Sequence, residues 1–259
     1  MIRSEIWSGL ALSVLSGCLL TVGFPSQQIY PLSWVALIPL LFALRGKSVG
    51  WAFALGYVCG LVHNFTVLFW IRYVIHHYGG LPLAVAILIL LLLCAYLGLY
   101  QACFAVFVRK WEAHPLLLAF CLPCAWVGLE FLRACALTGF PWANLGYTQT
   151  PLLELVQCAD ITGVYGISWL VVFGNTALLA FLTARKALVS LVIFAVCIVA
   201  AIIYGDSRLK ALREVQQEAE ALNVGVIQGN IDQSQKWNPA FQQETLRRYR
   251  ELSLGAVSG

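Results

Sequence analysis

Two cysteines, Cys121 and Cys124, are candidates for chemistry by their spacing alone, because they enclose two residues as C-L-P-C. A C-x-x-C pair does redox chemistry when one of the thiols is activated as a thiolate. Both cysteines lie within a long apolar run, however, where cysteine usually packs as a small hydrophobic residue. We therefore interpret them as packing residues and keep a membrane thiol oxidoreductase as an alternative.

Polar residues inside apolar segments are the next candidates, since a charge near membrane depth is costly and often functional. Glu130 and Arg133 are three residues apart, which places them on one face of a helix. A local ion pair close to the membrane interface is the simpler interpretation. His63 and Asn64 interrupt another apolar run, and a hydrogen bond inside a helix bundle explains them best.

The sequence offers no set of residues with the spacing of a metal site. The adjacent His76 and His77 would point to different sides of a helix, and no third ligand has a suitable spacing. We therefore expect neither a metal nor a cofactor.

The composition is that of an integral membrane protein. Hydrophobic residues make up 61% of the 259 residues and charged residues 11%, whereas a soluble domain has roughly 45–50% and about 25%. The net charge of +4 comes from short loops, because acidic and basic residues balance from Asp206 onward. Nothing in this pattern favours binding of nucleic acid.

Seven apolar segments are long enough to cross the membrane or nearly cross it, for which about 20 residues are needed. They are residues 6–22, 32–44, 51–71, 81–108, 116–132, 167–183 and 187–204. The second is the shortest, and whether it crosses fully is open. We predict a bundle of about seven transmembrane helices over residues 1–205.

Basic residues between these segments predict the orientation, because cytoplasmic loops are enriched in lysine and arginine. With a cytoplasmic amino terminus, only Arg72 and Arg133 lie on the outer side before the last span. The basic residues on the cytoplasmic side are then Arg3, Arg45, Lys47, Arg109, Lys110, Arg185 and Lys186. An odd number of spans places everything after Tyr204 outside the cytoplasm.

Two loops on the predicted outer side are rich in turn-forming and aromatic residues. The first, residues 23–31, carries no charge, and the second, residues 134–166, contains G-F-P-W-A-N-L-G-Y-T-Q and C-A-D-I-T-G-V-Y-G. Aromatic residues at the end of a span often only anchor it at the interface. A connection as long as the second loop is more often functional.

The remaining residues are typical of the start of a soluble α/β domain. Residues 206–222 predict a polar connecting helix, and the short apolar run around Val226 predicts a first buried strand. Asn238 and Pro239 then predict the start of a helix, with an N-cap followed by proline. One strand and one helix bury too little apolar surface for a stable core, so we expect the domain over residues 223–259 to be incomplete.

Three stretches make the chain resemble the apolipoprotein N-acyltransferases, bacterial membrane enzymes with a nitrilase-like domain. They are G-F-P-W-A-N-L-G-Y-T-Q (139–149), A-D-I-T-G-V-Y-G-I-S-W (159–169) and Q-G-N-I-D-Q-S-Q-K-W (228–237). They follow the family's order and lie behind the family's number of spans. The resemblance implies a multi-pass protein of the bacterial inner membrane, whose αββα nitrilase-like domain faces the periplasm.

The resemblance also implies a function in lipoprotein maturation. Family members move an acyl chain from phospholipid to the amino-terminal diacylglyceryl-cysteine of an apolipoprotein, through a thioester on a cysteine assisted by a glutamate and a lysine. No cysteine follows Cys197, and none of these three residues can be assigned here. We expect residues 1–259 to be inactive alone and the rest of the catalytic domain to be cut off or on a separate chain.

The resemblance implies one site residue in this sequence, Trp237 of the K-W pair. In the family this tryptophan helps to shape the entrance for lipid. Trp142 and Tyr147 in the long loop are further candidates for a lipid-facing mouth. Each of the three could instead pack under a helix or anchor a span. A polytopic permease is another alternative, although permeases usually have internal repeats, and we find none.

Overall fold

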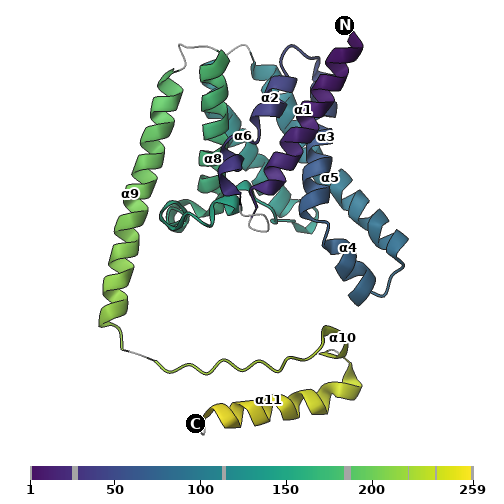
Figure 1. The fold of residues 1–259 in the computed structure, drawn as a ribbon, viewed down its shortest axis with the longest axis vertical. Coiled ribbons are helices and arrows are strands. Elements are labelled where there is room, and N and C mark those ends of the chain that lie inside the picture. The colour runs from purple at the N-terminus through teal and green to yellow at the C-terminus, as the bar shows by residue number, and fades with distance from the viewer. Residues whose placement is uncertain are drawn as a thin grey trace.

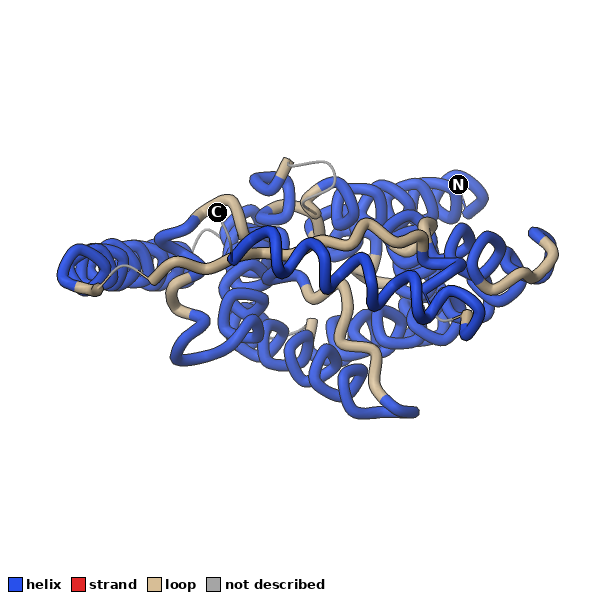
Figure 2. Tube along the Cα trace, turned by 90° about the horizontal axis from the view of Figure 1, so that it is seen from below, coloured by secondary structure: helices blue, strands red, loops and turns tan. Residues whose placement is uncertain are grey.

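The computed structural model of the protein describes residues 2–24, 29–112, 115–183, 188–220, 222–236 and 238–257. Within these ranges the regular secondary structure is helical, and no strand is present (Figure 2). The helices stand side by side in a bundle, and the last long helix leads from it to a thin terminal segment (Figure 1). The predicted helical membrane bundle is confirmed in this general form.

Five helices are long and apolar enough to cross a membrane. They are α1 (Ile2–Val22), α5 (Leu83–Trp111), α6 (Pro115–Cys135), α8 (Ala159–Thr183) and α9 (Leu188–Glu218). A sixth candidate span combines α3 (Val49–Val67) with α4 (Ile71–Tyr73) and the π-helical η2 (Val74–Tyr78). The segment Ile71–Tyr78 is bent by 57° relative to α3. The described residues thus provide five or six candidate spans, where the sequence predicted about seven.

The predicted second span is too short to pass as a transmembrane helix. It consists of a 3-10 helix, η1 (Tyr30–Trp34), and a short α-helix, α2 (Ile38–Ala43). These two pieces still return the chain along the bundle. The Tyr30 carbonyl at one end accepts a hydrogen bond from Gln149, and the Gly46 N–H at the other end donates one to Glu112.

Side chains of neighbouring helices satisfy the backbone between η1 and α2. Asn175 of α8 accepts from the Leu37 N–H at 2.9 Å and donates to the Ser33 carbonyl at 2.9 Å. The Ser16 hydroxyl of α1 donates to the Ala36 carbonyl at 2.6 Å. A break in a helix is tolerated in an apolar bundle because such partners replace the lost intrahelical bonds.

Helices α3 and α5 pack closely through small residues. A Cβ atom added at Gly56 would lie 2.5 Å from the Ala105 Cβ, and one added at Gly60 would lie 2.8 Å from the Gly98 Cα. Gly56 and Gly60 form a G-x-x-x-G pattern, which lets two membrane helices approach each other.

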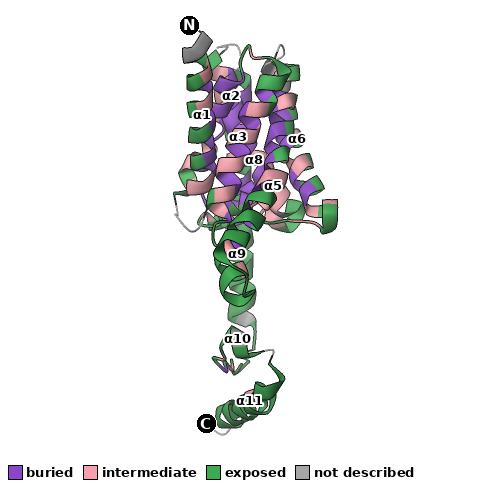
Figure 3. Ribbon diagram, turned by 90° about the vertical axis from the view of Figure 1, so that its right-hand side faces the viewer, coloured by how far each residue is buried: buried purple, intermediate pink, exposed green. Residues whose placement is uncertain are grey.

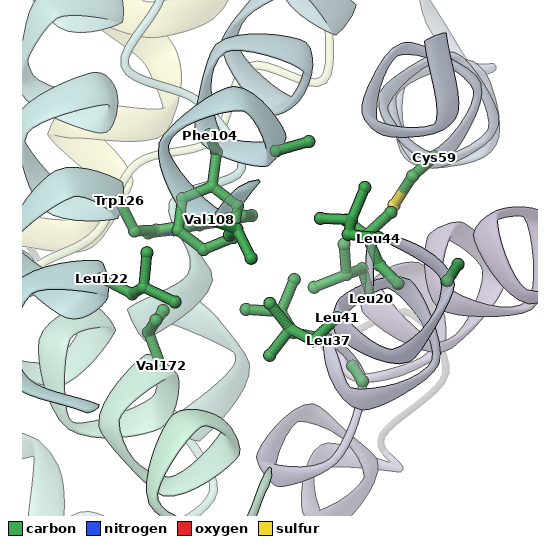
Figure 4. Packing of buried hydrophobic residues seen from close by; sticks show 14 of the residues in the cluster. Leu20, Leu37, Leu41, Leu44, Cys59, Phe104, Val108, Leu122, Trp126 and Val172 are labelled. Carbon is green, nitrogen blue, oxygen red and sulfur yellow. The ribbon is translucent and has the colours of Figure 1, made fainter. Parts of the chain in front are cut away.

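Burial is highest where the helices meet and decreases toward their outer faces (Figure 3). The largest apolar cluster joins α1, α2, α3, α5, α6 and α8, and Figure 4 shows its facing side chains, among them Leu41, Phe104 and Leu122. The outer faces are also apolar, and only 17% of the most apolar part of α9 is buried within the protein. Such faces suit contact with lipid better than contact with water.

Charged residues mark one end of the bundle, which we call the basic end. Lys47 pairs with Glu5 at 3.4 Å, and Arg109 pairs with Glu112 at 2.8 Å. The Arg109 Nε also donates to the Lys47 carbonyl. The start of α1, the turn before α3 and the end of α5 therefore meet there, as the distribution of basic residues along the sequence predicted.

Helix α9 continues without a break from its apolar part into a polar part that ends at Glu218. Residues 222–232 after it have no regular structure, and Val224 and Val226 are 72% and 88% exposed. The predicted first strand is therefore not formed within the described residues. A strand is stable only when it is paired, and no other described segment pairs with this one.

A helix does form where the sequence predicted one. The short α10 (Gln233–Lys236) is followed by η6 (Pro239–Phe241) and α11 (Gln242–Val257). The Asn238 Oδ1 accepts a hydrogen bond from the Ala240 N–H at 3.0 Å, which confirms Asn238 as the predicted N-cap.

Candidate functional site

The long connection between α6 and α8 lies at the end of the bundle opposite the basic end (Figure 1). Residues 139–149, called here the GFPW loop after their first four residues, end in the 3-10 helix η4 (Leu145–Gln149). Three polar side chains of this loop, those of Asn144, Thr148 and Gln149, are at most 1% exposed. A loop with buried polar groups needs specific partners, because an unpaired group of this kind is costly.

The backbone just before the loop and in its first half adopts uncommon conformations. Leu137, Thr138 and Ala143 have positive φ angles of 49°, 75° and 57°, which side chains with a Cβ rarely adopt. Gly139 has a φ of 83°, and a Cβ added there would lie 2.1 Å from the Ala134 carbonyl oxygen. Strained residues persist only where the surrounding structure holds them, and they gather at functional sites.

Glu130 and Arg133 of α6 hold the centre of the loop. The Glu130 Oε1 accepts from the Leu145 N–H at 2.7 Å and from the Trp126 indole N–H at 2.9 Å. The Arg133 Nη2 donates to the Asn144 Oδ1 at 2.7 Å. The two charged side chains, both in the described part of α6, do not form the local ion pair that the sequence favoured, because each bonds to the loop instead.

Further contacts fix the second half of the loop. The Gly146 N–H donates to the Ser168 hydroxyl of α8 at 2.8 Å. The Gln149 side chain accepts from the Trp34 indole N–H at 3.0 Å and donates to the Tyr30 carbonyl at 3.4 Å. The loop is thereby joined to α6, to α8 and to the segment that follows α1.

Two aromatic side chains of the loop point away from these contacts. Trp142 is 49% exposed and Tyr147 is 43% exposed. The Trp142 ring stacks on Trp70 from the segment after α3, with centroids 5.1 Å apart and planes inclined by 19°, and it also contacts Phe140. Together with Trp70 and Phe140, they form what we call the aromatic end of the bundle.

The sequence candidates Trp142 and Tyr147 thus both lie at the aromatic end, although no ring contact joins them within the described residues. The third candidate, Trp237, lies outside the described residues. Sequence reasoning missed Trp70, which lies at the end of the predicted span 51–71 and precedes Arg72. An exposed tryptophan next to a single charge at the end of a span was the available signal.

Two other polar candidates, His63 and Asn64, serve the packing of the bundle. His63 Nδ1 lies 3.1 Å from the Thr21 hydroxyl, and the Asn64 side chain donates to the Gly60 carbonyl at 2.8 Å, as the hydrogen-bond interpretation predicted. Cys121 and Cys124 are both free thiols, and both are exposed within the described residues. The Cys124 Sγ accepts from the Trp169 indole N–H at 3.3 Å, a packing contact between α6 and α8.

A second set of contacts ties the connection to α9. The Asp160 carboxylate accepts from the Tyr204 hydroxyl at 2.8 Å and pairs with Arg208 at 3.2 Å. A Cβ added at Gly205 would lie 1.7 Å from the Glu154 carbonyl oxygen, so the two backbones touch. The polar part of α9 therefore leaves the bundle at the aromatic end and carries residues 222–257 away from it (Figure 1).

Comparison with known proteins agrees with these features. A profile of the apolipoprotein N-acyltransferase N-terminal domain matches residues 16–177. An apolipoprotein N-acyltransferase of Geobacter metallireducens is 44% identical over 254 residues, covering 95% of this chain and 48% of its own. Those of Nitrosomonas europaea and Haemophilus influenzae are 33% and 30% identical, over 89% and 93% of this chain and 46% of their own.

The chain spans about half the length of the relatives that it matches. The matched profile runs from within α1 to within α8 and so includes the GFPW loop with the residues that hold it. A profile that covers more than half of the chain and a 44% identical relative agree on one family. The chain belongs to the apolipoprotein N-acyltransferase family and contains its amino-terminal membrane domain.

Proposed function

We propose that residues 1–259 are the membrane part of an apolipoprotein N-acyltransferase, which binds phospholipid at the aromatic end and passes an acyl chain to a diacylglyceryl apolipoprotein. One observation carries the proposal. The GFPW loop is held by buried polar contacts, yet it leaves Trp142 and Tyr147 about half exposed. The polar contacts thus hold two exposed aromatic side chains in fixed positions at the end of the bundle.

The chemistry of these side chains suits a phospholipid. The stacked rings of Trp142 and Trp70 offer a flat apolar surface to an acyl chain. The indole N–H and the Tyr147 hydroxyl can donate to ester or phosphate oxygens, which is why such side chains favour the membrane–water interface. A lipid lying across the aromatic end would keep its glycerol esters near the interface.

We further propose that the aromatic end faces the periplasm and the basic end the cytoplasm. This orientation follows the usual excess of basic residues on the cytoplasmic side. Residues 206–222 would then lead to a nitrilase-like domain that begins at residue 223. Trp237, at the start of that domain, would complete the lipid-facing mouth from the periplasmic side.

We assign the groups that carry out the acyl transfer itself to the part of the protein outside residues 1–259. In the family reaction a thiolate attacks a phospholipid ester and releases a lysophospholipid, and the α-amino group of the apolipoprotein then attacks the thioester. The last cysteine in the chain is Cys197, within the apolar part of α9. The proposal therefore assigns lipid binding to residues 1–259 and the covalent steps to a catalytic glutamate, lysine and cysteine outside them.

The test uses the complete reading frame that contains residues 1–259. Its product is placed in phospholipid vesicles with a diacylglyceryl-cysteine peptide, and the lipids and the peptide are analysed by mass spectrometry. We expect lysophospholipid and N-acylated peptide in equal amounts. Residues 1–259 alone should leave both substrates unchanged. A folded full-length product that forms no lysophospholipid, or a thioester trapped on residues 1–259, would refute the proposal.

A substitution locates the lipid mouth. Trp142→Ala in the full-length product should raise the KM for phospholipid roughly tenfold, since the loss of one aromatic contact costs about 1–1.5 kcal/mol. Trp111→Ala is the matched control, because Trp111 is 44% exposed, close to the 49% of Trp142, but lies at the end of α5, by the basic end. Equal effects of the two substitutions on KM would argue against a mouth at the aromatic end.

A further inference from the structure

Glu130 and Arg133 stand out because both charged side chains are almost completely buried, at 5% and 4% exposed. A buried charge is tolerated when it is paired and hydrogen-bonded. Here the partners are two consecutive residues of the GFPW loop. Glu130 accepts a hydrogen bond from the Leu145 N–H, and Arg133 donates one to the Asn144 side-chain oxygen.

Hydrogen bonds from the loop stabilise the two charged side chains that are buried in the bundle. If residues 144 and 145 moved away, a carboxylate and a guanidinium would both lose a hydrogen bond in an apolar environment, which is strongly unfavourable. The next residue, Gly146, bonds to Ser168 on the facing helix. Three consecutive loop residues are thereby attached to three side chains from two helices, and Tyr147 follows directly.

We infer that Glu130, together with Arg133, is a positioning residue that sets the place of Trp142 and Tyr147 at the aromatic end. This inference rests on the proposed function only in that the positioned residues would contact phospholipid. Glu130 itself is buried beneath the loop. Its effect on the reaction would pass through the geometry of the loop.

The chemistry of the contacts provides a conservative substitution. The Glu130 Oε1 alone accepts both hydrogen bonds, from Leu145 and from Trp126. A glutamine side chain keeps one oxygen that can accept both, while a leucine side chain accepts neither. Glu130→Gln should therefore preserve the position of the loop even though it removes the negative charge beside Arg133.

The stacked Trp70 and Trp142 rings give a readout that is independent of turnover. Two indole rings with centroids 5.1 Å apart couple electronically and contribute a signal to the near-ultraviolet circular dichroism. The part of the spectrum that is lost in a Trp70→Phe variant defines this indole signal. We expect the Glu130→Leu variant to lose the indole signal. Its KM for phospholipid should rise roughly tenfold, with a smaller change in kcat. Glu130→Gln should keep the signal and a KM within about threefold of the wild type.

A milder variant covers the case in which Glu130→Leu does not fold. Ser168→Ala removes the acceptor of the Gly146 N–H and leaves Glu130 and Arg133 unchanged, so it should fold and weaken the indole signal in part. A folded Glu130→Leu or Ser168→Ala protein with the full signal would overturn the inference, as would a Glu130→Gln protein that loses the signal completely. The signal is measured without substrate, so a failure of the proposed acyl transfer would leave this test intact.

Discussion

Two adjacent polar residues of α8, Asn175 and Thr176, repair breaks in neighbouring helices. Asn175 bonds to the backbone between η1 and α2, as described above. Thr176 donates to the Ala119 carbonyl at 3.0 Å. That carbonyl lacks its helical partner because the residue four positions later is Pro123, which has no N–H. At the residue scale, the bundle depends on a few polar side chains that replace missing backbone bonds.

Replacing Asn175 by leucine should therefore destabilise the bundle well beyond the loss of one side-chain contact. The Leu37 N–H and the Ser33 carbonyl would both remain buried without their partner, at a cost of about 2–4 kcal/mol. Ser13→Ala is the control, since Ser13 is equally buried but bonds only to the Gly9 carbonyl within its own helix. Unfolding in dodecyl sulphate, followed by tryptophan fluorescence, measures both, and equal effects would contradict this role of Asn175.

At the scale of elements, small residues at the contact between α3 and α5 allow the two helices to approach each other closely. Gly56 and Gly60 on one helix face Ala105 and Gly98 on the other, so the backbones meet without intervening side chains. Membrane helices gain little from the hydrophobic effect among themselves, and close packing of small residues is their main source of affinity. The G-x-x-x-G pattern was present in the sequence, but only the structure identifies α5 as its partner.

A single methyl group tests this contact. Gly60→Ala should lower the free energy of unfolding by about 1–3 kcal/mol, because the new Cβ would lie 2.8 Å from the Gly98 Cα and 3.0 Å from its carbonyl oxygen. Gly50→Ala in the same helix has no atom within 4 Å of its Cβ, so it should leave stability unchanged or raise it by up to about 1 kcal/mol. The same unfolding assay compares the two variants, and effects of the same sign and size would rule out the close contact.

At the scale of the whole molecule, the two ends of the bundle differ in chemistry. The basic end gathers Lys47, Arg109 and their acidic partners, and the opposite end gathers Trp70, Trp142 and Tyr147. A membrane protein with such ends has a preferred orientation, since arginine and lysine favour the cytoplasmic side. The polar part of α9 extends from the aromatic end, so the orientation also decides where residues 222–257 lie.

Reporter fusions test the orientation directly. Alkaline phosphatase fused after Gly259 should be active and a green fluorescent protein in the same place should be dark, because the former needs the periplasm and the latter folds in the cytoplasm. The reverse result is expected for fusions after Glu112, at the basic end. Fluorescence at residue 259 would place the terminal segment in the cytoplasm and exclude a periplasmic acyl transfer.

Part of the candidate site could be predicted from the sequence alone. The length of the connection and its turn-forming and aromatic residues in 139–149 favoured a functional loop, with Trp142 and Tyr147 as candidates for a lipid-facing mouth. The partners of Glu130 and Arg133 could not be predicted, since a spacing of three residues also fits a local ion pair. Only the fold of the loop onto α6 brings Asn144 and Leu145 within 2.7 Å of them.

The sequence by itself determined that this protein is a helical membrane bundle with one basic end, because apolar length and the placement of lysine and arginine are properties of the chain. The tertiary structure decided that residues 30–43 return along the bundle as two short pieces, because that path depends on hydrogen bonds from Asn175 and Ser16 on other helices. It also decided that the run around Val226 stays unpaired within the described residues. A strand is a property of at least two segments, and helical hydrogen bonds are a property of one.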